Sequence, residues 1–229
     1  MERLETRQLE ALNRLKTKKE TCPELIAYIS HTLPDDLYDN ILNFLEPLQM
    51  DTREWKMVDM NIIKFARKVT AEWDEEGSLF RPCEEYRRDE EWIIHWMNAE
   101  TFVELAYYDL TGLQLDFHFE NVKSMVPGKK LFLVLEGLAA LFNRAKTAKN
   151  RVYQSAVSTH MGGPARGSQH NNTLADLDVE KVEMALINLQ LRHEIRVVQT
   201  TCAADSAEWV SILAADIATI PYRYLFSNA

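Results

Sequence analysis

The stretch Lys130-Leu-Phe-Leu-Val-Leu-Glu136 decides the fold class, because it is the clearest strand in the sequence. Its continuous run of apolar residues is typical of a strand that is buried on both faces, as in parallel sheets. The dipeptide Pro127-Gly128 predicts a turn before it, and a basic helix follows. We therefore expect this strand to lie centrally in the sheet of an α/β domain.

Predicted strands and helices alternate on both sides of this stretch. The strands are expected at Glu24–Ser30, within Trp55–Trp73 (one or two strands), at Trp92–Met97 and at Ile195–Thr200. The helices are expected at Leu37–Leu48, Thr101–Tyr108, Leu115–Met125, Val179–Leu191 and Ala203–Ile220. Such alternation predicts an α/β fold with a mainly parallel sheet that is mixed at its edge and flanked by helices.

Two segments differ from this pattern. Residues 2–20 are polar with sparse leucines, which predicts an amphipathic helix, so we take 1–21 as a linker or docking helix and 22–229 as one domain. The stretch 158–173 is rich in glycine and polar residues and poor in apolar ones. We expect it to be a flexible insertion.

The composition is that of a globular protein from a reducing compartment inside the cell. The chain has 229 residues, of which 46% are hydrophobic and 27% charged, which is enough for a packed core. Its cysteines, Cys22, Cys83 and Cys202, are too widely spaced for a metal-ligand pair or a disulfide framework. No apolar run approaches the length of a membrane span, so no membrane partner is expected.

The charge distribution is uneven along the chain. The net charge is −9, yet Gly137–Ala175 contains no Asp or Glu. The cations of this stretch that fall on the predicted basic helix and its end are Arg144, Lys146, Lys149 and Arg151. One basic stretch in an acidic protein indicates local contact with phosphates or acidic partners. From charge alone, a merely solvated basic segment is an equally good interpretation.

Common catalytic motifs are absent from the sequence. It contains no phosphate-binding or dinucleotide-binding glycine loop, no G-x-S-x-G and no HExxH. His95 lies in an apolar strand, so we interpret it as half-buried and satisfied. His118 shares a predicted helix with Glu120, and we interpret it as a surface histidine.

Several segments resemble the nuclease-like domain of the XPF family. They are Ile63–Val69, Trp92–Leu105, Lys130–Leu138 (a strand ending in Glu-Gly), Val182–Gln190, Ile195–Thr200, Asp205–Trp209 and Ile220-Pro-Tyr-Arg223. The last segment is the most specific and is similar to fungal non-catalytic partner subunits of the essential-meiotic-endonuclease type. The resemblance implies a restriction-endonuclease-like α/β fold over nearly all of the chain beyond the first helix.

The resemblance also implies that this chain has no catalytic centre. Active family members use a Gly-Asp pair and a Glu-Arg-Lys motif with a later Asp, in which carboxylates hold a metal and the lysine stabilises developing charge. The corresponding positions here are His95, Trp96, Met97 and Thr101. These residues do not suit Mg²⁺, which prefers oxygen ligands. We therefore expect no cofactor in this chain, and Mg²⁺ in a catalytic partner.

The implied role is that of a subunit that positions branched DNA. We expect a heterodimer with a catalytic XPF-family nuclease, acting in the nucleus on flaps, nicked junctions and forks in recombination and repair. The DNA-binding residues would be Arg144, Lys146, Lys149 and Arg151. The partner interface would be the apolar face of the last helix, with Trp209, Ile212, Leu213 and Ile217. The family's tandem helix-hairpin-helix motifs are not expected in this chain, because it stops at Ala229.

Two other functions remain open at this point. One is an active metal nuclease with displaced carboxylates, which requires Glu100, Glu104 and Glu136 to converge on one point. The other is a protein-interaction scaffold that does not contact DNA.

Overall fold

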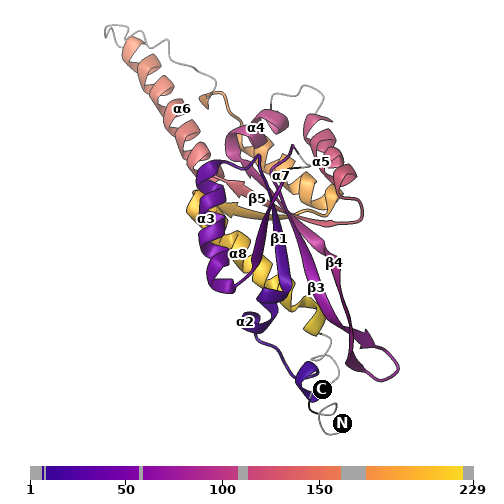
Figure 1. The fold of residues 1–229 in the computed structure, drawn as a ribbon. Helices are drawn as coiled ribbons and strands as arrows, with labels where there is room; N and C mark the ends of the chain where they lie inside the picture. The colour runs from indigo at the N-terminus through magenta and orange to yellow at the C-terminus, as the bar shows by residue number, and fades with distance from the viewer. Residues whose placement is uncertain (1–6, 8, 57–58, 108–112, 161–173, 224–229) are drawn as a thin grey trace.

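The computed structural model describes residues 7, 9–56, 59–107, 113–160 and 174–223. Within these residues the chain forms a six-stranded sheet in the order β2-β1-β3-β4-β5-β6 (Figure 1). The strands are β1 (Leu25–Ser30), β2 (Asp51–Trp55), β3 (Ile62–Asp74), β4 (Leu79–Asn98), β5 (Lys130–Glu136) and β6 (Arg196–Thr200). The strand that decided the fold class is β5, the fifth of the six, and it is paired on both sides.

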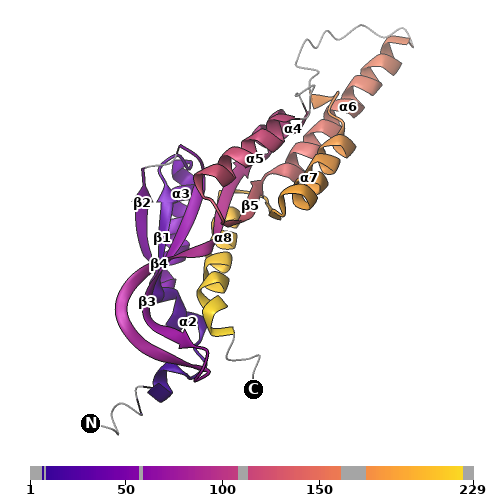
Figure 2. The same ribbon diagram turned by 90° about the vertical axis from the view of Figure 1, so that its right-hand side faces the viewer.

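Helices cover both faces of the sheet (Figure 2). One face packs against α4 (Ala99–Tyr107), α5 (Leu113–Met125), α6 (Leu138–His160) and α7 (Val179–His193). The other face packs against α3 (Asp35–Leu45) and α8 (Ala203–Thr219). Short turns of 3-10 helix, η1 (Cys22–Glu24), η2 (Glu46–Leu48) and η4 (Ile220–Arg223), follow α2 (Lys18–Thr21), α3 and α8. None of the described helices is long and apolar enough to cross a membrane.

The predicted α/β fold of restriction-endonuclease-like type, with a mixed sheet flanked by helices, is confirmed. Parallel pairs join β1 to β2, β4 to β5 and β5 to β6. The expectation that the mixed part lies at the edge is wrong, because β3 lies inside the sheet and is antiparallel to both β1 and β4. The inner position of β3 follows from the short turn that joins it to β4, since a hairpin places consecutive strands side by side.

The β3–β4 hairpin is much longer than the sequence pattern indicates. The strand predicted at Trp92–Met97 is the last part of the 20-residue strand β4, which also contains the charged run Glu84–Glu91. Beyond the sheet the two strands pair with each other, and their outer part curves away from the other strands in Figure 2. Because most side chains of this outer part face solvent, the alternation of apolar and polar residues is lost. The short strand β2 was also missed, and it too is largely polar.

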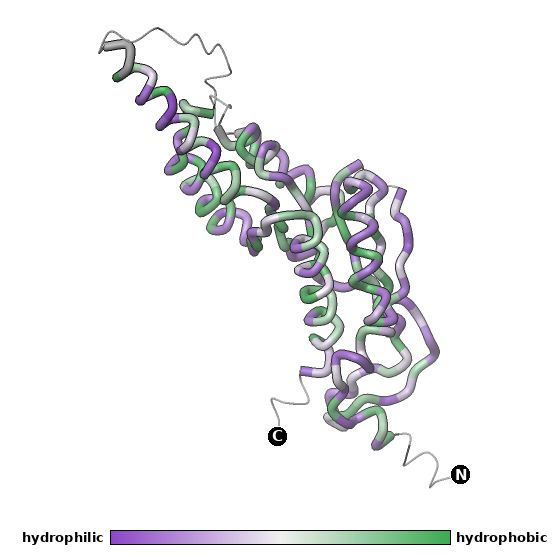
Figure 3. Tube along the Cα trace, turned by 90° about the vertical axis from the view of Figure 1, so that its left-hand side faces the viewer, coloured by the Kyte–Doolittle hydropathy of each residue, from purple (hydrophilic) through white to green (hydrophobic). Residues whose placement is uncertain are grey.

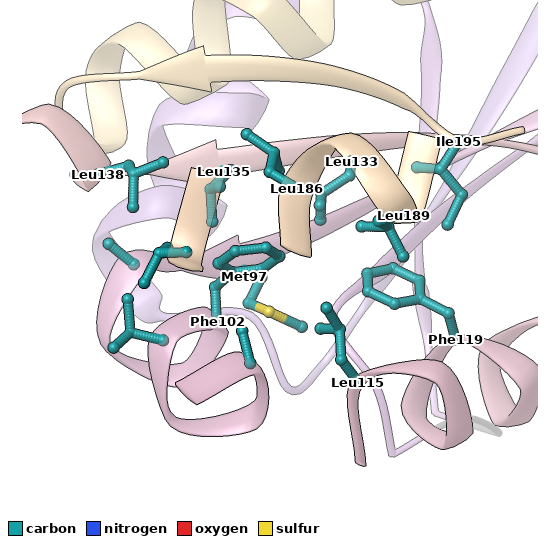
Figure 4. Close-up of a cluster of buried hydrophobic side chains, with 14 of the residues drawn as sticks. Met97, Phe102, Leu115, Phe119, Leu133, Leu135, Leu138, Leu186, Leu189 and Ile195 are labelled. Carbon is teal, nitrogen blue, oxygen red and sulfur yellow. The ribbon is translucent and has the colours of Figure 1, made fainter. Parts of the chain in front are cut away.

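The core forms two clusters, one on each face of the sheet. On the first face, Phe102 and Phe119 are fully buried, and Figure 4 shows Phe102 beside Met97 and below Leu135. On the second face, the fully buried Ile41 of α3 and Phe65 of β3 pack with α8. Burying one large apolar side chain contributes about 1.5–3 kcal/mol, so the clusters dominate the stability of the fold.

The N-terminal prediction of one helix over residues 2–20 is wrong beyond residue 12. Residues 9–12 are helical, but the chain bends at Asn13 and is not helical again until α2. The side-chain amide of Asn13 donates to the Phe80 carbonyl at 3.0 Å and accepts from the Phe80 amide at 2.6 Å. These tertiary bonds to the hairpin end the helix. Residues 1–6 and 8 lie outside the described residues.

The predicted insertion at 158–173 falls almost entirely outside the described residues. Its first residues, 158–160, complete α6, and the chain is described again from residue 174. The flexibility of this insertion therefore stays a prediction. The same holds for the boundary between 1–21 and the domain.

Candidate functional site

The ends of three parallel strands, β4, β5 and β6, meet at the edge where the resemblance places a catalytic centre. Asn98, Glu136 and Thr200 lie side by side across these ends. The Asn98 side chain accepts a hydrogen bond from the Thr101 amide at 2.8 Å, so it caps α4. Thr101 itself is exposed on the first turn of α4. The junction between β4 and α4 thus fixes the places of His95, Trp96, Met97 and Thr101, the residues that the resemblance aligns with the catalytic motif of active family members.

His95 is held inside this junction as a neutral ring. Its side chain is 2% exposed, with Nδ1 3.0 Å from the Asn61 carbonyl oxygen and Nε2 3.0 Å from Nε2 of His118. Because a carbonyl can only accept, His95 Nδ1 carries the proton, and His95 Nε2 accepts from His118. Burial, with a smaller contribution from the neighbouring His118, lowers the pKa of His95 to about 3. The ring is therefore neutral near pH 7.

His118 is not the surface residue that the sequence indicated. It is partly buried on α5 and contacts His95 across the face of the sheet, and burial lowers its pKa as well. The two histidines are far apart in the sequence, so no local spacing predicts the pair. Their contact depends on how α5 packs against β3 and β4.

Glu136, at the end of β5, is occupied by two donors. Ser206 Oγ donates to Glu136 Oε2 at 2.6 Å, and Trp96 Nε1 donates to the same oxygen at 3.2 Å. Ser206 is fully buried and also bonds Thr200 Oγ1 at 2.7 Å. Since Ser206 uses its proton on Glu136, Thr200 donates to Ser206. Sequence reasoning missed Ser206 and Thr200, because neither lies in a recognisable motif.

The residues at this edge do not fit a divalent metal of the type that active family members hold. Mg²⁺ takes oxygen ligands in near-octahedral geometry. Here the positions offer the ring of His95, the indole of Trp96 and the buried thioether of Met97, beside the single carboxylate of Glu136. No metal-assisted step can be derived from this set.

The alternative site of displaced carboxylates is not formed. Glu100 pairs with Arg144 on α6, Glu104 is exposed on α4, and Glu136 bonds Trp96 and Ser206. Among the described residues, no three His, Cys, Asp or Glu side chains gather so that they could hold a metal ion. Glu100, Glu104 and Glu136 therefore do not converge on one point, and this alternative prediction is wrong.

The basic helix α6 projects away from the sheet and the other helices (Figures 1 and 2). Every residue from Lys149 to Val157 is exposed, so its outer half has no packing within the described chain. Arg144 and Arg151 are about two turns apart and share one side of the helix, while Lys146 and Lys149 lie on another. Arg144 pairs with Glu100, whereas the other three cations have no acidic partner among the described residues. A ligand that lies along one side of the helix therefore cannot contact all four cations.

The last helix, α8, is only partly available to a partner. It is mainly hydrophobic along its length (Figure 3). Trp209 and Ile212 are 37% and 39% exposed. Leu213 and Ile217 are buried in the chain's own core, so of the four residues predicted for a partner interface only Trp209 and Ile212 are open to a partner. Helical periodicity places these residues on a helix but cannot tell which part of a wide apolar face the sheet already covers.

Known proteins similar to this chain agree with the resemblance seen in the sequence. The chain is 24% identical over 218 residues to crossover junction endonuclease eme1 of Schizosaccharomyces pombe, covering 93% of this chain and 28% of that relative. It is 22% identical over 230 residues to crossover junction endonuclease EME1 of Eremothecium gossypii, covering 97% of this chain and 31% of the relative. The chain therefore spans less than a third of the length of these relatives.

Two further comparisons concern the fold and the family. XPF from Aeropyrum pernix aligns with 88% of this chain and 67% of its own, at a TM-score of 0.41 and 12% identity. The ERCC4 domain model matches residues 35–213, which is most of the 229 residues. The chain belongs to the ERCC4 domain family.

Proposed function

We propose that this chain is the non-catalytic, DNA-positioning subunit of a heterodimeric structure-specific endonuclease. The complex would cleave branched DNA such as flaps, nicked junctions and forks, in recombination and repair, in the nucleus. The names of its relatives, crossover junction endonucleases, support the class of reaction. The observation that carries the non-catalytic role is the strand end at His95, Trp96 and Met97, which has a neutral ring pair and a core thioether in place of metal ligands.

The catalytic partner would supply the chemistry. An XPF-family nuclease subunit would contribute the carboxylates, and its Mg²⁺ would generate the attacking hydroxide. This chain's own contribution would be to bind the partner and to hold the DNA relative to it. Both tasks require surfaces rather than a reactive centre.

The DNA surface would be the outer half of α6. Lys146, Lys149 and Arg151 are exposed and without acidic partners in the described chain. Phosphate contacts of this type position a duplex without reading its sequence, which suits recognition by shape. Arg144 is the weaker candidate of the four, because it must first release Glu100.

The partner surface would include Trp209 and Ile212 on α8. Both are large apolar side chains that the chain leaves more than a third exposed. Interface hot spots are enriched in tryptophan, and they carry most of the binding energy of a complex. The buried neighbours Leu213 and Ile217 would support this surface from beneath.

The decisive test is a cleavage assay on flap and nicked-junction DNA with Mg²⁺. The chain is assayed alone and then mixed with an XPF-family catalytic subunit. We expect no cleavage by the chain alone and cleavage by the mixture. Cleavage by the chain alone, abolished by Glu136→Ala or Glu100→Ala, would overturn the proposal and show an enzyme.

A second experiment separates the DNA role from a pure scaffold. The triple variant of Lys146, Lys149 and Arg151 to Gln is compared with a matched control in which Lys18, Arg53 and Lys56 are changed to Gln. The control cations are exposed, and each is ion-paired away from α6. We expect only the α6 variant to weaken duplex binding by the complex. In that variant the slope of the logarithm of the binding constant against the logarithm of the salt concentration should become shallower by about 0.9 for each phosphate that is no longer neutralised. Equal binding by both variants would favour the scaffold.

A third experiment tests the partner surface. Trp209→Ala should weaken binding to the catalytic subunit by about 2 kcal/mol or more, as at other hot spots, while leaving the fold intact. Leu213→Ala, one turn further along α8, should instead destabilise the chain by about 2–5 kcal/mol, because it opens a cavity in the core. If Trp209→Ala does not change pairing, α8 is not the interface.

A further inference from the structure

A second group of exposed cations lies where β5 and β6 begin, beside Trp92 in the interior of β4. Trp92 on β4 is aligned with Lys130 on β5, and Phe132 on β5 is aligned with Arg196 on the edge strand β6. Trp92 lies six residues before Asn98 on β4, so this group is about 20 Å from the strand ends described above. It is therefore separate from the site described above.

The four side chains form a layered arrangement of rings and cations. The rings of Trp92 and Phe132 are 4.6 Å apart between centroids. The Arg196 guanidinium lies 4.5 Å from the Trp92 ring and 5.8 Å from the Phe132 ring, and Lys130 Nζ lies 5.5 Å from Trp92. Each distance is within the range of a cation–π interaction. The two rings thus hold two cations at fixed places on the surface.

Arg196 has no acidic partner within the described part of the chain. Lys130 pairs with Glu91 at 2.8 Å, but both side chains are more than half exposed, and such pairs are weak. A stacked guanidinium loses less rotamer freedom on binding than a free one, and its planar donors match the oxygens of a phosphate. The arrangement is thus prepared for an anion rather than neutralised by the protein.

A groove of 1080 Å³, lined by Trp92 and Lys130 but not by Phe132 or Arg196, runs from this group along the β3–β4 hairpin. At the end near the sheet it is lined by Trp92, Lys130 and Arg88, together with Asp89, Glu90 and Glu91. These three acidic residues are ion-paired with Lys64, Arg67 and Lys130, whereas Arg88 has no acidic partner among the described residues. At the hairpin tip it is lined by Glu72 and Glu75. The charges near the sheet end without an acidic partner in the described chain are therefore Arg88 and the neighbouring Arg196, and an anionic ligand would bind there.

We propose that Arg196 and Lys130, held on the Trp92–Phe132 ring pair, bind the backbone phosphates of a nucleic-acid strand. A strand is favoured over an isolated anion because the cations are spread over three strands, with Arg196 on β6, Lys130 on β5 and Arg88 on β4. Its bases can stack on the outer face of the Arg196 guanidinium or on exposed ring surface, as in other single-strand sites. The inference rests on the proposed DNA-binding function and adds a second contact on a different part of the surface.

The test measures fluorescence anisotropy of a fluorescein-labelled 20-nucleotide single strand and of its duplex, with the full chain at several salt concentrations. The variants are Arg196→Gln and Trp92→Leu. The control is Arg53→Gln, which removes one exposed, ion-paired arginine from β2 at the far edge of the sheet. Thermal melts check that each variant is folded.

We expect Arg196→Gln to weaken single-strand binding about tenfold, the effect of one charged hydrogen-bonding group. For this variant the slope of the logarithm of the binding constant against the logarithm of the salt concentration should become shallower by about 0.7, which corresponds to one phosphate on a single strand. Trp92→Leu should weaken binding about fivefold or more, while Arg53→Gln should leave it unchanged. A larger effect on the duplex than on the single strand would overturn the single-strand assignment.

The remaining outcomes separate this inference from the proposed function. If the α6 triple variant weakens binding while Arg196→Gln does not, the inference fails and the DNA-binding function stands. If the unsubstituted chain binds neither probe, both fail. If Arg196→Gln weakens pairing with a catalytic subunit but not oligonucleotide binding, the ring pair belongs to a protein interface, and the inference is overturned.

Discussion

Arg67 is the residue whose loss should destabilise the fold most sharply through charge. It lies on β3 with 3% of its side chain exposed. It donates to Glu90 at 2.5 Å, to Glu24 at 3.0 Å and to the Ile217 carbonyl at 3.1 Å. These partners belong to β4, to η1 and to α8, so one guanidinium joins three separate parts of the chain. The perturbation we consider is Arg67→Ala.

The magnitude follows from the burial of the partners. Glu90 is 8% exposed, so without Arg67 it becomes a buried carboxylate with no cation. Removing one member of a buried ion pair costs about 3–5 kcal/mol. Glu24 keeps Lys16 at 2.8 Å and the Tyr222 hydroxyl at 2.6 Å, so we add nothing for it. For a domain of this size, the loss corresponds to a fall in Tm of about 6–20 °C.

The assay is urea unfolding followed by circular dichroism, with a thermal melt as a second measure. The comparison is the double variant Arg67→Met with Glu90→Gln, which removes the cation and its buried acidic partner together. Because no buried charge is left alone, this variant should recover most of the lost stability. A loss below about 1 kcal/mol in Arg67→Ala, or a double variant as unstable as the single one, would refute the reasoning.

Further predictions concern the strand ends. The pKa of His95 is about 3 in the folded chain, against an ordinary value of 6.5. Below pH 6.5 the unfolded chain therefore binds more protons than the folded chain. The free energy of unfolding should fall as the pH drops from 6.5 towards 3, by up to about 1.4 kcal/mol per pH unit. Urea midpoints at several pH values check this, and His95→Gln should flatten the profile. Ser206→Ala removes a donor to Glu136 and should cost about 1.5–3 kcal/mol in the same assay; an unchanged midpoint would contradict the bond's importance. Addition of Mg²⁺ or of EDTA should leave the Tm of the chain alone unchanged, whereas a saturable rise with Mg²⁺ would reveal a site that these residues do not indicate.

Strong local signals predicted the regular elements of the fold. The apolar run of β5 marked a strand paired on both sides. Asp178, a residue type that favours helix starts, precedes α7, and its side chain accepts from the amides of Glu180 and Lys181. Both signals are contained in a few consecutive residues. They do not depend on what the rest of the chain does, which is why they are visible in the sequence.

The hairpin was not predicted because its stability comes from pairing rather than from an apolar face. The outer part of β4 has charged or polar side chains at most positions, and Arg67 and Glu90 are buried although their residue types are usually exposed. A charged residue that is buried through an ion pair is invisible to a hydropathy pattern. The sequence pattern therefore indicated a strand only from Trp92, whereas β4 begins at Leu79.

The contacts of the candidate site were not foreseen from the sequence. The resemblance identified His95, Trp96 and Met97, yet the groups that hold them, Asn61 and His118 among them, come from other elements. The same is true of α8, where one apolar face is divided between core and surface. Tertiary packing decides both results, and no local spacing contains that information.

The contacts at the strand ends explain how this fold can be stable without a metal. A cluster of carboxylates repels itself unless a cation neutralises it, so an active centre of this type is costly in the metal-free state. Here a neutral histidine pair and a single carboxylate with two donors satisfy one another. In the described residues, no buried side-chain nitrogen or oxygen lacks a hydrogen-bond partner. His95, Trp96 and Met97 at this edge are thus part of the core, while cations without an acidic partner among the described residues lie on α6 and at Arg196, where a partner or DNA can reach them.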